Sequence, residues 1–468
     1  MTERGTARHP RGFRLYPRGF RLQAEAPERR VSIRLIDSVV TTEALEEAFS
    51  NEALLSAMLR FEVALSRAEV RAGVMPSSVA DAIAAVPLEA FDAAALTRGA
   101  RSSGTIATAF VETLVARVQY TAPAAAPFVH WGTTSQDLAD TSFALCLQRA
   151  RGVLAPDHER LVTALRRLSE QHRDTVMLAR TLLQPAAPTT FGLKAAGWFA
   201  ATSRSFAAVA AAFDDACVVQ FGGAAGTLAA LGPHGVRVGE DLARDLGLAY
   251  PGAPWHSHRE RLASLVAACG VYTGTLAKIA RDVTLLMQFE VAEAAEPGGG
   301  SSAMPHKRNP GGCAVALAAA SRVPGLVAAL LGGMAQEHER GVGGWQGEAA
   351  TIADTIRACG SALAAMVTVV DGLTVDPDRM KRNLSETRGV VFAERAMGVL
   401  APALGREPAQ RAIAAAIDAA AAGRATFTEA LRADADVAAA LGAGAGSLEN
   451  PEQYLGSAEA FRRRLLGE

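Results

Sequence analysis

The most unusual stretch of the sequence is a glycine- and serine-rich segment that ends in charged and amide side chains. It reads Pro297-Gly-Gly-Gly-Ser-Ser-Ala-Met-Pro-His-Lys-Arg-Asn-Pro310. Three consecutive glycines permit a loop whose backbone can approach a ligand closely, and Pro310 is suited to the first turn of a helix. Backbone N–H groups at such a junction between loop and helix stabilise anions. The segment therefore predicts a loop that binds an anionic substrate.

The side chains of this segment suit proton removal next to a carboxylate. Ser301 and Ser302 follow the glycines, and a serine held among N–H donors can accept a proton as a general base. Lys307 and Asn309 can hold a carboxylate by charge and hydrogen bonding. Met304 lies between these groups and is predicted to contact the substrate. A flexible glycine linker with a stray charge is the alternative that the segment alone leaves open.

The elements that must position this loop are predicted to be helices. Aromatic residues make up 6% of the 468-residue chain, runs of Val, Ile, Tyr and Thr are rare, and alanine, the strongest helix former, is abundant. Several alanine- and leucine-rich segments exceed the usual helix length of about 8–20 residues. Short Gly- or Pro-containing loops separate them, which favours a bundle. These segments span 138–176, 189–218, 259–294, 310–337 and 347–370.

We expect an all-α fold of three helical domains. Residues 1–35 are predicted to be a disordered basic tail, because they are rich in Pro, Gly and Arg and contain a short tandem repeat. An N-terminal helical domain is expected at 36–120, a central helical bundle carrying the 297–310 loop at 121–370, and a C-terminal helical domain at 371–468. Because the long helices are apolar all round, they must also bury surface against a partner, so we expect a homo-oligomer.

Composition and charge exclude several classes of protein. Hydrophobic residues account for 50% and charged residues for 20%, which excludes disorder of the whole chain. A net charge of -1 provides no overall basic field for nucleic acid or an anionic membrane. No uninterrupted apolar run reaches the roughly 18 residues of a membrane span, and the N-terminus lacks the apolar stretch of a secretory signal. The five cysteines form no CxxC pair, which is typical of reduced thiols in a cytoplasmic protein.

Several segments carry a resemblance to a known family. Gly300-Ser-Ser-Ala-Met-Pro-His-Lys-Arg-Asn-Pro310 resembles the signature loop of the fumarase/aspartase superfamily, with nearly every signature position present. His130-Trp-Gly-Thr-Thr-Ser-Gln-Asp137 resembles the first substrate-binding segment of that superfamily. Further segments are similar to its 3-carboxy-cis,cis-muconate cycloisomerase-like branch, and the resemblance covers about residues 40–465. These segments are Gln220–Gly232, Trp255-His256 and Gln336–Arg340.

This resemblance implies a fold, an assembly and a reaction. The fold would be an all-α homotetramer with a central bundle of long helices, and each active site would take segments from three subunits. The chemistry would be anti elimination or addition beside a carboxylate of a small di- or tricarboxylate, without cofactor or metal. A base removes the proton next to the carboxylate, cations and hydrogen-bond donors hold the resulting aci-carboxylate, and the β-substituent leaves.

The resemblance also implies roles for individual residues. By position, Ser301 is the base and Ser302 is its neighbour. Lys307 and Asn309 would bind one substrate carboxylate. Helix capping is the alternative role for the threonines of the first segment. The residues that would bind a second carboxylate, by hydroxyl and amide donation, are Thr134, Ser135 and Gln136.

Two positions depart from the family pattern. The superfamily usually carries a His after the Gln of the segment that here reads Thr181–Pro188, and this position is Pro185, which cannot donate a proton. In the loop near residue 105, the family's Asn-Ser pair is Thr105-Ile106. Ile106 cannot form a hydrogen bond to a substrate, and Thr105 is predicted to substitute for the missing group in part. The expected reaction is therefore one that needs less help from a general acid.

The absence of this general acid narrows the range of possible leaving groups. Amine or hydroxide must be protonated to depart, so loss of the acid costs roughly 10²–10⁴-fold in rate. We therefore expect a lyase that expels a weakly basic group from a C4-dicarboxylate to give fumarate, with nitrosuccinate, which yields fumarate and nitrite, ranked first. The alternative is cycloisomerisation of 3-carboxy-cis,cis-muconate. An inactive helical scaffold and an adenylosuccinate lyase are weaker alternatives.

Other polar residues have two interpretations each. Arg259 and Arg261 are predicted to bind a substrate carboxylate bidentately, with a structural ion pair as the alternative. No His or Cys spacing with adjacent carboxylates supports a metal site, and no nucleotide, flavin or pyridoxal motif is visible. Another set is interpreted as an ion-pair network or as a solvated helix face, namely Glu337, Glu339, Arg340 and Glu348.

Overall fold

The computed structural model describes residues 33–300, 303–442 and 447–468. Residues 1–32 of the predicted tail lie outside the described residues, as do both signature serines, Ser301 and Ser302. The described part of the chain is built mainly of helices, which confirms the predicted helical class. The strands described are confined to two short two-stranded sheets. The predicted domain boundaries stay a prediction.

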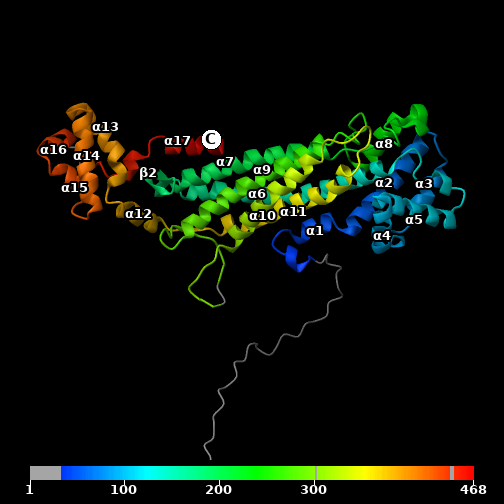
Figure 1. The fold of residues 1–468 in the computed structure, drawn as a ribbon, viewed down its shortest axis with the longest axis horizontal. Helices are drawn as coiled ribbons and strands as arrows, with labels where there is room; N and C mark the ends of the chain where they lie inside the picture. The colour runs from blue at the N-terminus through cyan, green and yellow to red at the C-terminus, as the bar shows by residue number, and fades with distance from the viewer. Residues whose placement is uncertain (1–32, 301–302, 443–446) are drawn as a thin grey trace, which may run out of the picture.

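Five long helices form the bundle at the centre of the molecule (Figure 1). Their alanine-rich sequences favour the helical backbone, and polar caps begin some of them: the Thr190 hydroxyl accepts the Leu193 N–H at 3.1 Å. Large buried side chains such as Tyr272 and Phe191 join one continuous core. The helices are α6 (Ser135–Gln171), α7 (Phe191–Ala216), α9 (Glu260–Met287), α10 (Gly311–Gly332) and α11 (Gly344–Asp371).

Shorter helices surround one end of this bundle (Figure 1). The longest of them, α2, packs on α6 and α8 and is capped by Ser50, whose hydroxyl accepts the Ala53 N–H. The group comprises α1 (Glu43–Ala48), α2 (Asn51–Arg71), α3 (Ser77–Ala84), α4 (Ala93–Ser103), α5 (Ile106–Thr121) and α8 (Gly235–Leu246). The 3-10 helices of this part are η1 (Leu35–Asp37), η2 (Leu88–Ala90), η3 (Ala126–Phe128) and η4 (Ala229–His234).

The C-terminal helices lie at the opposite end (Figure 1). Four of them enclose a separate small core that includes Phe427 and Leu400, whereas the last helix, α17, packs back along α7. The elements are α12 (Pro377–Glu386), α13 (Ala393–Leu404), α14 (Arg406–Ala421), α15 (Phe427–Arg432), α16 (Ala435–Leu441) and α17 (Ala458–Leu466), with the 3-10 helices η5 (Val390–Phe392) and η7 (Pro451–Tyr454).

A β-hairpin interrupts the helices between α6 and α7. Strands β1 (Val176–Thr181) and β2 (Gln184–Thr190) pair antiparallel, and β3 (Ala294–Ala295) pairs with β4 (Thr374–Val375). The two-residue turn of the first hairpin has positive φ angles of 51° and 65° at Leu182 and Leu183. Such turns ordinarily use Asn-Gly, because a side chain beyond glycine strains this backbone. The sequence analysis did not predict this hairpin.

The two ends of the bundle hold different predicted site residues. Thr134 lies at the start of α6, and the hairpin β1–β2 follows the end of the same helix. Because an α-helix rises 1.5 Å per residue, the 37 residues of α6 separate them by about 55 Å. The 28 residues of α9 likewise separate Arg259 from the segment leading into the 297–310 loop by about 42 Å. These site segments therefore lie far apart within one chain.

Three helices are long and apolar enough, by length and composition alone, to cross a membrane: α9, α10 and α11. The sequence analysis considered uninterrupted apolar runs, whereas these helices are apolar on average and still contain charged residues such as Arg322 of α10. The apolar windows of α9 and α11 are 56% and 72% buried in the chain's own core, but that of α10 is only 22% buried. The rest of the chain thus buries a smaller share of α10 than of α9 or α11.

Candidate active site

The predicted substrate-binding residues at the start of α6 meet the side chain of Arg340. Its guanidinium donates to Thr134 Oγ1 at 2.8 Å, to Ser135 Oγ at 3.3 Å and to Gln136 Oε1 at 3.3 Å. Arg340 belongs to the connection between α10 and α11 and is half-buried. The structure therefore brings these three predicted residues together and adds an arginine. The sequence analysis placed Arg340 in an ion-pair network or on a solvated helix face instead.

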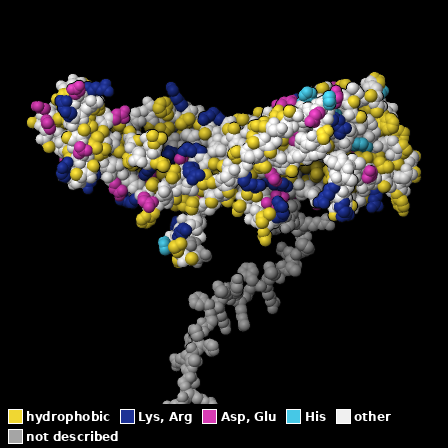
Figure 2. Space-filling view, viewed as in Figure 1, with side chains coloured by type: hydrophobic (Ala, Val, Ile, Leu, Met, Phe, Trp, Pro, Cys, Tyr) yellow, Lys and Arg dark blue, Asp and Glu magenta, His cyan; other side chains and the backbone are white. Residues whose placement is uncertain are grey.

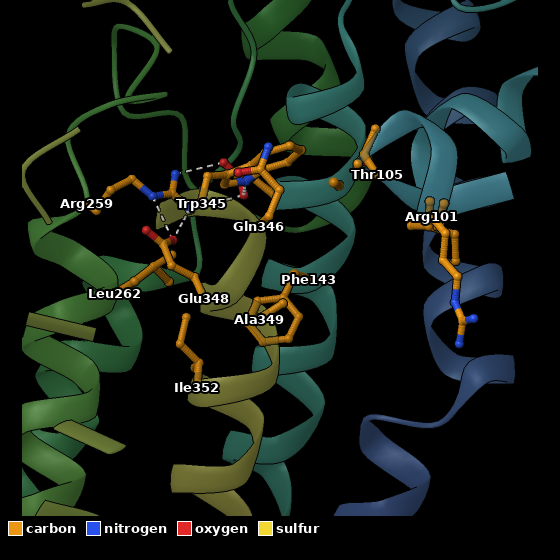
Figure 3. Close-up of a pocket in the computed structure, with 15 residues that line it drawn as sticks. Arg101, Thr105, Phe143, Arg259, Leu262, Trp345, Gln346, Glu348, Ala349 and Ile352 are labelled. Atoms are coloured by element: carbon orange, nitrogen blue, oxygen red, sulfur yellow. Dashed lines mark hydrogen bonds and ion pairs between the residues drawn. The ribbon is translucent and has the colours of Figure 1, made fainter. Parts of the chain in front are cut away.

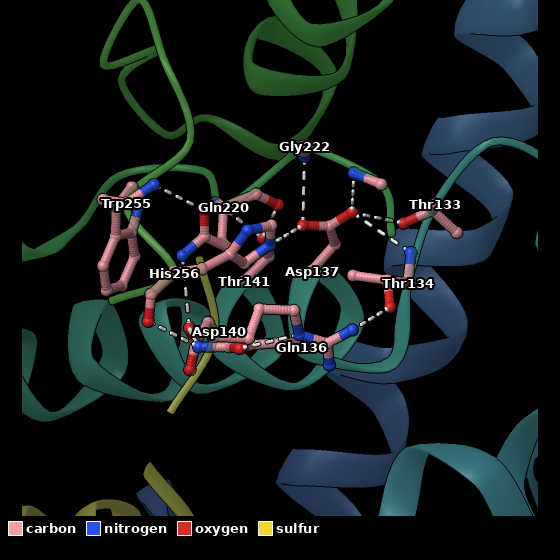
Figure 4. Close-up of polar contacts among 12 residues, drawn as sticks. Thr133, Thr134, Gln136, Asp137, Asp140, Thr141, Gln220, Gly222, Trp255 and His256 are labelled. Carbon is pink, nitrogen blue, oxygen red and sulfur yellow. Dashed lines mark hydrogen bonds and ion pairs between the residues drawn. The ribbon is translucent and has the colours of Figure 1, made fainter. Parts of the chain in front are cut away.

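A buried carboxylate fixes the start of α6. Asp137 accepts the backbone N–H groups of Gly222, Gly223 and Thr134 at 3.1, 2.8 and 3.1 Å, and also the Thr133 hydroxyl at 3.1 Å. Nε2 of His256 lies 2.7 Å from Oδ1, the oxygen that also accepts the Gly222 N–H (Figure 4). Because a carboxylate with this many partners is fully satisfied, it anchors the loop of 222–223 to the helix. Thr134 therefore has part of its alternative role in helix capping, because its backbone N–H donates to Asp137.

Arg259 makes the contacts of a structural ion pair. Its guanidinium donates to Asp140 at 2.8 and 3.1 Å and to Glu348 at 2.9 and 2.7 Å. It also lies 4.6 Å from the ring centroid of Trp255 and is only 2% exposed. Burial raises the pKa of Glu348 although Arg259 acts to lower it. These contacts are those of the ion-pair alternative, and a direct contact of Arg259 with substrate stays a prediction.

A cavity of about 490 Å³ lies beside this ion pair (Figure 3). Thr105 and Arg259, both predicted site residues, line it together with Trp345 and Glu348. The Thr105 hydroxyl also caps α5 by accepting the Ala107 N–H at 3.2 Å. Ile106 contributes an apolar wall, as expected of a side chain that cannot bind a carboxylate. The cavity lies between α4–α5, α6 and the start of α11, and a contact of Thr105 with substrate stays a prediction.

A second buried carboxylate faces His130, just before the first substrate-binding segment. Nδ1 of His130 lies 2.6 Å from Oε1 of Glu62. Burial lowers the pKa of His130, but the charge and hydrogen bond of Glu62, aided by Asp137, raise it above its ordinary value. Burial, and then the charge of Glu62, raise the pKa of Glu69 to about 9. The sequence analysis did not single out either glutamate.

The signature loop projects from the body of the molecule and carries His, Lys and Arg side chains (Figure 2). The two sides of the loop meet where the Asn309 N–H donates to the Gly299 carbonyl at 2.6 Å. A Cβ on Gly299 would come 1.9 Å from the Asn309 carbonyl oxygen, so only glycine permits this approach. Lys307 and Met304 are exposed in the described part of the loop. The loop therefore presents Lys307 and Met304 outward, away from the rest of its own chain.

Buried Glu296 joins the loop to the helix that follows. Its carboxylate accepts the backbone N–H groups of Gly312 and Cys313 at 2.8 and 3.0 Å, at the start of α10. A carboxylate at this position complements the positive end of the helix. The sequence analysis expected Pro310 to open this helix, and Pro310 is the residue that precedes α10.

Pro185 lies at the other end of the bundle, in strand β2. It pairs with Arg180 across the hairpin and lines a cavity of about 590 Å³. Arg180 is held by a bidentate ion pair with Glu293 at 2.9 and 2.7 Å, and Asn383 donates to the same carboxylate at 2.7 Å. The hairpin is therefore tied to the segment that leads into the signature loop. Within one chain it does not reach Thr134 or Thr105.

The helical bundle and the signature loop define a lyase of the fumarase/aspartase superfamily. The chain belongs to the Lyase family, whose model matches residues 37–325. It is 42% identical over 438 residues to the 3-carboxy-cis,cis-muconate cycloisomerase of Bradyrhizobium diazoefficiens, covering 92% of this chain and 97% of the relative. It is 41% identical over 441 residues to a nitrosuccinate lyase of Streptomyces davaonensis, covering 90% and 92%.

A solved structure shows the same fold. The 3-carboxy-cis,cis-muconate lactonizing enzyme of Pseudomonas putida superimposes with a TM-score of 0.87 at 39% identity, covering 92% of this chain and 98% of that chain. The superfamily predicted from the signature loop is thus confirmed. Among the described residues, no group of three or more His, Cys, Asp or Glu could hold a metal ion.

Proposed function

We propose that this lyase interconverts 3-carboxy-cis,cis-muconate and its lactone. The observation that carries the proposal is similarity to named cycloisomerases along almost the whole chain, in sequence and in fold. The sequence analysis ranked nitrosuccinate first, and the comparisons favour its alternative, the cycloisomerase. The physical reason for the first ranking, the missing acid at Pro185, is compatible with both reactions, because a carboxylate is also a weakly basic leaving group.

The residues of the chain suit this interconversion. In ring closure, a carboxylate oxygen adds to a carbon–carbon double bond, the electron pair moves onto the neighbouring carboxylate, and the resulting aci-carboxylate takes a proton at carbon. Ring opening reverses these steps, with Ser301 as the group that removes the proton. Lys307 and Asn309 supply the positive charge and N–H donors that stabilise the aci-carboxylate. Ring closure of the ionised acid takes up one proton and ring opening releases it, so neither direction needs a further co-reactant.

Nitrosuccinate elimination is the second candidate. It is supported by the 41% identical nitrosuccinate lyase and by Pro185, because nitrite leaves without a proton. The same Ser301, Lys307 and Asn309 would serve, and the two reactions differ in the size of the substrate and in what departs.

We also propose that the active site is completed by other copies of the chain in a homotetramer. The start of α6 and the signature loop lie at opposite ends of helices about 40–55 Å long, so one chain cannot bring them together. The loop projects outward, and α10 leaves apolar surface uncovered. An antiparallel arrangement of copies would bury α10 and bring the loop of one copy to the α6 end of another.

Incubation of the purified protein with each substrate, followed by proton NMR, tests the assignment. Lactone formed only from 3-carboxy-cis,cis-muconate is the expected result. Fumarate and nitrite formed only from nitrosuccinate would establish the second candidate instead. Turnover of neither compound would overturn both.

A further inference from the structure

A further cavity lies at the hairpin end of the bundle. It has a volume of about 520 Å³ and lies between the β1–β2 hairpin and helices α7, α9 and α17. Among the described residues that line it, none is a predicted site residue. Its volume is within the range of about 300–1,000 Å³ that small-molecule sites occupy. The cavity is therefore large enough to hold a ligand of its own.

Apolar side chains and one bare stretch of helix form much of the cavity wall. Leu193 of α7, Ile279 of α9 and Leu465 of α17 contribute aliphatic surface. Gly197, which also lines the cavity, lies inside α7, where glycine weakens a helix relative to alanine. A Cβ at this position would meet no atom of the described residues within 4 Å. Packing within the described chain therefore does not require this glycine, and its missing side chain keeps the cavity open.

One carboxylate in the cavity wall is shared by three donors. Asp282 accepts the indole N–H of Trp198 at 2.8 Å and also pairs with Lys278. Nζ of Lys194 lies 3.9 Å from the same carboxylate, which is beyond hydrogen-bond distance. An ammonium group has three N–H donors and no acceptor. The described residues offer these donors of Lys194 no closer acidic group.

The charges around Lys194 leave one positive charge without a partner. Arg180, which also lines the cavity, is neutralised by its bidentate ion pair with Glu293. Lys194 and Lys278 share the single carboxylate of Asp282. Burial lowers the pKa of Lys194, although Asp282 acts to raise it. An additional anion in the cavity would therefore stabilise this half-buried ammonium.

We propose that this cavity binds a small monocarboxylate with an apolar body, and that the carboxylate of the ligand pairs with Lys194. One surplus positive charge matches one carboxylate, and the aliphatic wall beside Gly197 matches a ring or a short chain. The substrates proposed above carry two or three carboxylates and little apolar surface. This site would therefore hold a different class of ligand, and the inference does not rest on the proposed function.

Isothermal titration calorimetry of the full chain with two probes tests the charged part of the site. Cyclohexanecarboxylate carries one carboxylate on an apolar ring, and cyclohexanecarboxamide is its neutral counterpart. Lys194→Met is expected to weaken binding of the carboxylate by roughly 10–100-fold, as loss of a charged hydrogen bond does, and to change binding of the amide by less than about threefold. Lys194→Arg should recover part of the loss, because it restores the positive charge.

Gly197→Leu tests the apolar part of the cavity independently. Its side chain would fill the open space beside the helix, so binding of both probes should be lost. Gly197→Ala adds a single methyl group to that space and should retain binding of both. Lys381→Met, an exposed change on α12, is the matched control and should bind both probes as the wild type does.

Two outcomes would overturn the inference. One is a wild-type protein that binds neither probe. The other is binding of the carboxylate that Lys194→Met leaves unchanged, because the probe would then lie elsewhere. Thermal unfolding shows beforehand that each variant is folded. If Gly197→Leu does not fold, the comparison of Lys194→Met with Lys381→Met still decides the question.

Discussion

Nδ1 of His130 lies 2.6 Å from Oε1 of Glu62, a carboxylate that is only 1% exposed. The pair joins α2 to the turn that leads into the first substrate-binding segment. Its geometry fixes the orientation of the imidazole, as a carboxylate does for a histidine elsewhere in proteins. The pair therefore links the charge state of His130 to the position of Thr134.

Replacing Glu62 by Gln is expected to lower the pKa of His130. In the wild-type protein burial lowers this pKa, but Glu62 outweighs burial and raises it above 6.5. Gln carries no charge, so the effect of burial would prevail in the variant. NMR titration of the His130 ring measures the pKa directly. Glu52→Gln, an exposed change on the same helix, should leave it unchanged.

The same shift predicts a dependence of stability on pH. Because the folded pKa of His130 is raised above its unfolded value of 6.5, its contribution is fully present below pH 6.5 and is lost as the pH rises through the folded pKa. The stability advantage of the wild-type protein over Glu62→Gln should therefore shrink between pH 5.5 and 8.5. Urea denaturation at several pH values checks this, and an advantage that grows with pH would contradict it.

Glu69→Gln is expected to stabilise the protein at alkaline pH. Burial raises the pKa of Glu69 to about 9, so its stabilising contribution is complete below pH 4.5 and is lost as the pH rises toward 9. Gln avoids this loss, and the variant should exceed the wild type by about 1–3 kcal/mol at pH 8. At pH 4.5 the two should be nearly equal. Equal unfolding curves at pH 8 would show that Glu69 is ionised without cost.

Arg259→Met is expected to destabilise the fold by about 3–5 kcal/mol, because it leaves the buried carboxylates of Asp140 and Glu348 without a cation. Arg261→Met removes only a surface pair and should cost less than about 1 kcal/mol. Chemical denaturation of the two variants side by side measures the difference. Similar stabilities would show that the Arg259 ion pair is not a structural element.

Ser301→Ala is expected to abolish turnover without altering the oligomer, because it removes the proposed base.

Lys307→Met should mainly lower kcat, since Lys307 is proposed to stabilise the aci-carboxylate, whereas a rise in KM alone would make it a uniform binding group. Steady-state kinetics and gel filtration measure both effects. Ser385→Ala, an exposed change on α12, is the control and should behave as wild type.

Mixing inactive variants tests the shared active site. If Thr134 and Ser301 of one site come from different copies, refolding Ser301→Ala together with Thr134→Val should restore activity, because some mixed sites contain neither change. Ser301→Ala mixed with Lys307→Met should not recover, because one loop supplies both residues to the same site. Recovery in neither mixture would indicate that each chain completes its own site.

Local features of the sequence predicted the helical class, the glycine-rich loop and the superfamily. Alanine-rich segments favour helices wherever they occur, and the Gly299 approach to Asn309 depends on glycines that are adjacent in the chain. The hairpin at 176–190 was not predicted, because its turn places Leu182 and Leu183 at positive φ, a conformation that no local preference favours.

The sequence by itself determined which chemical groups the chain contains and which family they belong to, since these depend on residue types and on spacing along the chain. Only the tertiary structure decided their partners. Arg259 meets Asp140 from 119 residues away, and Arg340 meets Thr134 from 206 residues away. The sequence suggested a carboxylate-binding role for Arg259 and an ion-pair network or a solvated helix face for Arg340. Folding instead buries Arg259 against two acids and leaves Arg340 beside neutral oxygens. Such long-range pairing follows from how the helices pack, and spacing along the chain does not encode it locally.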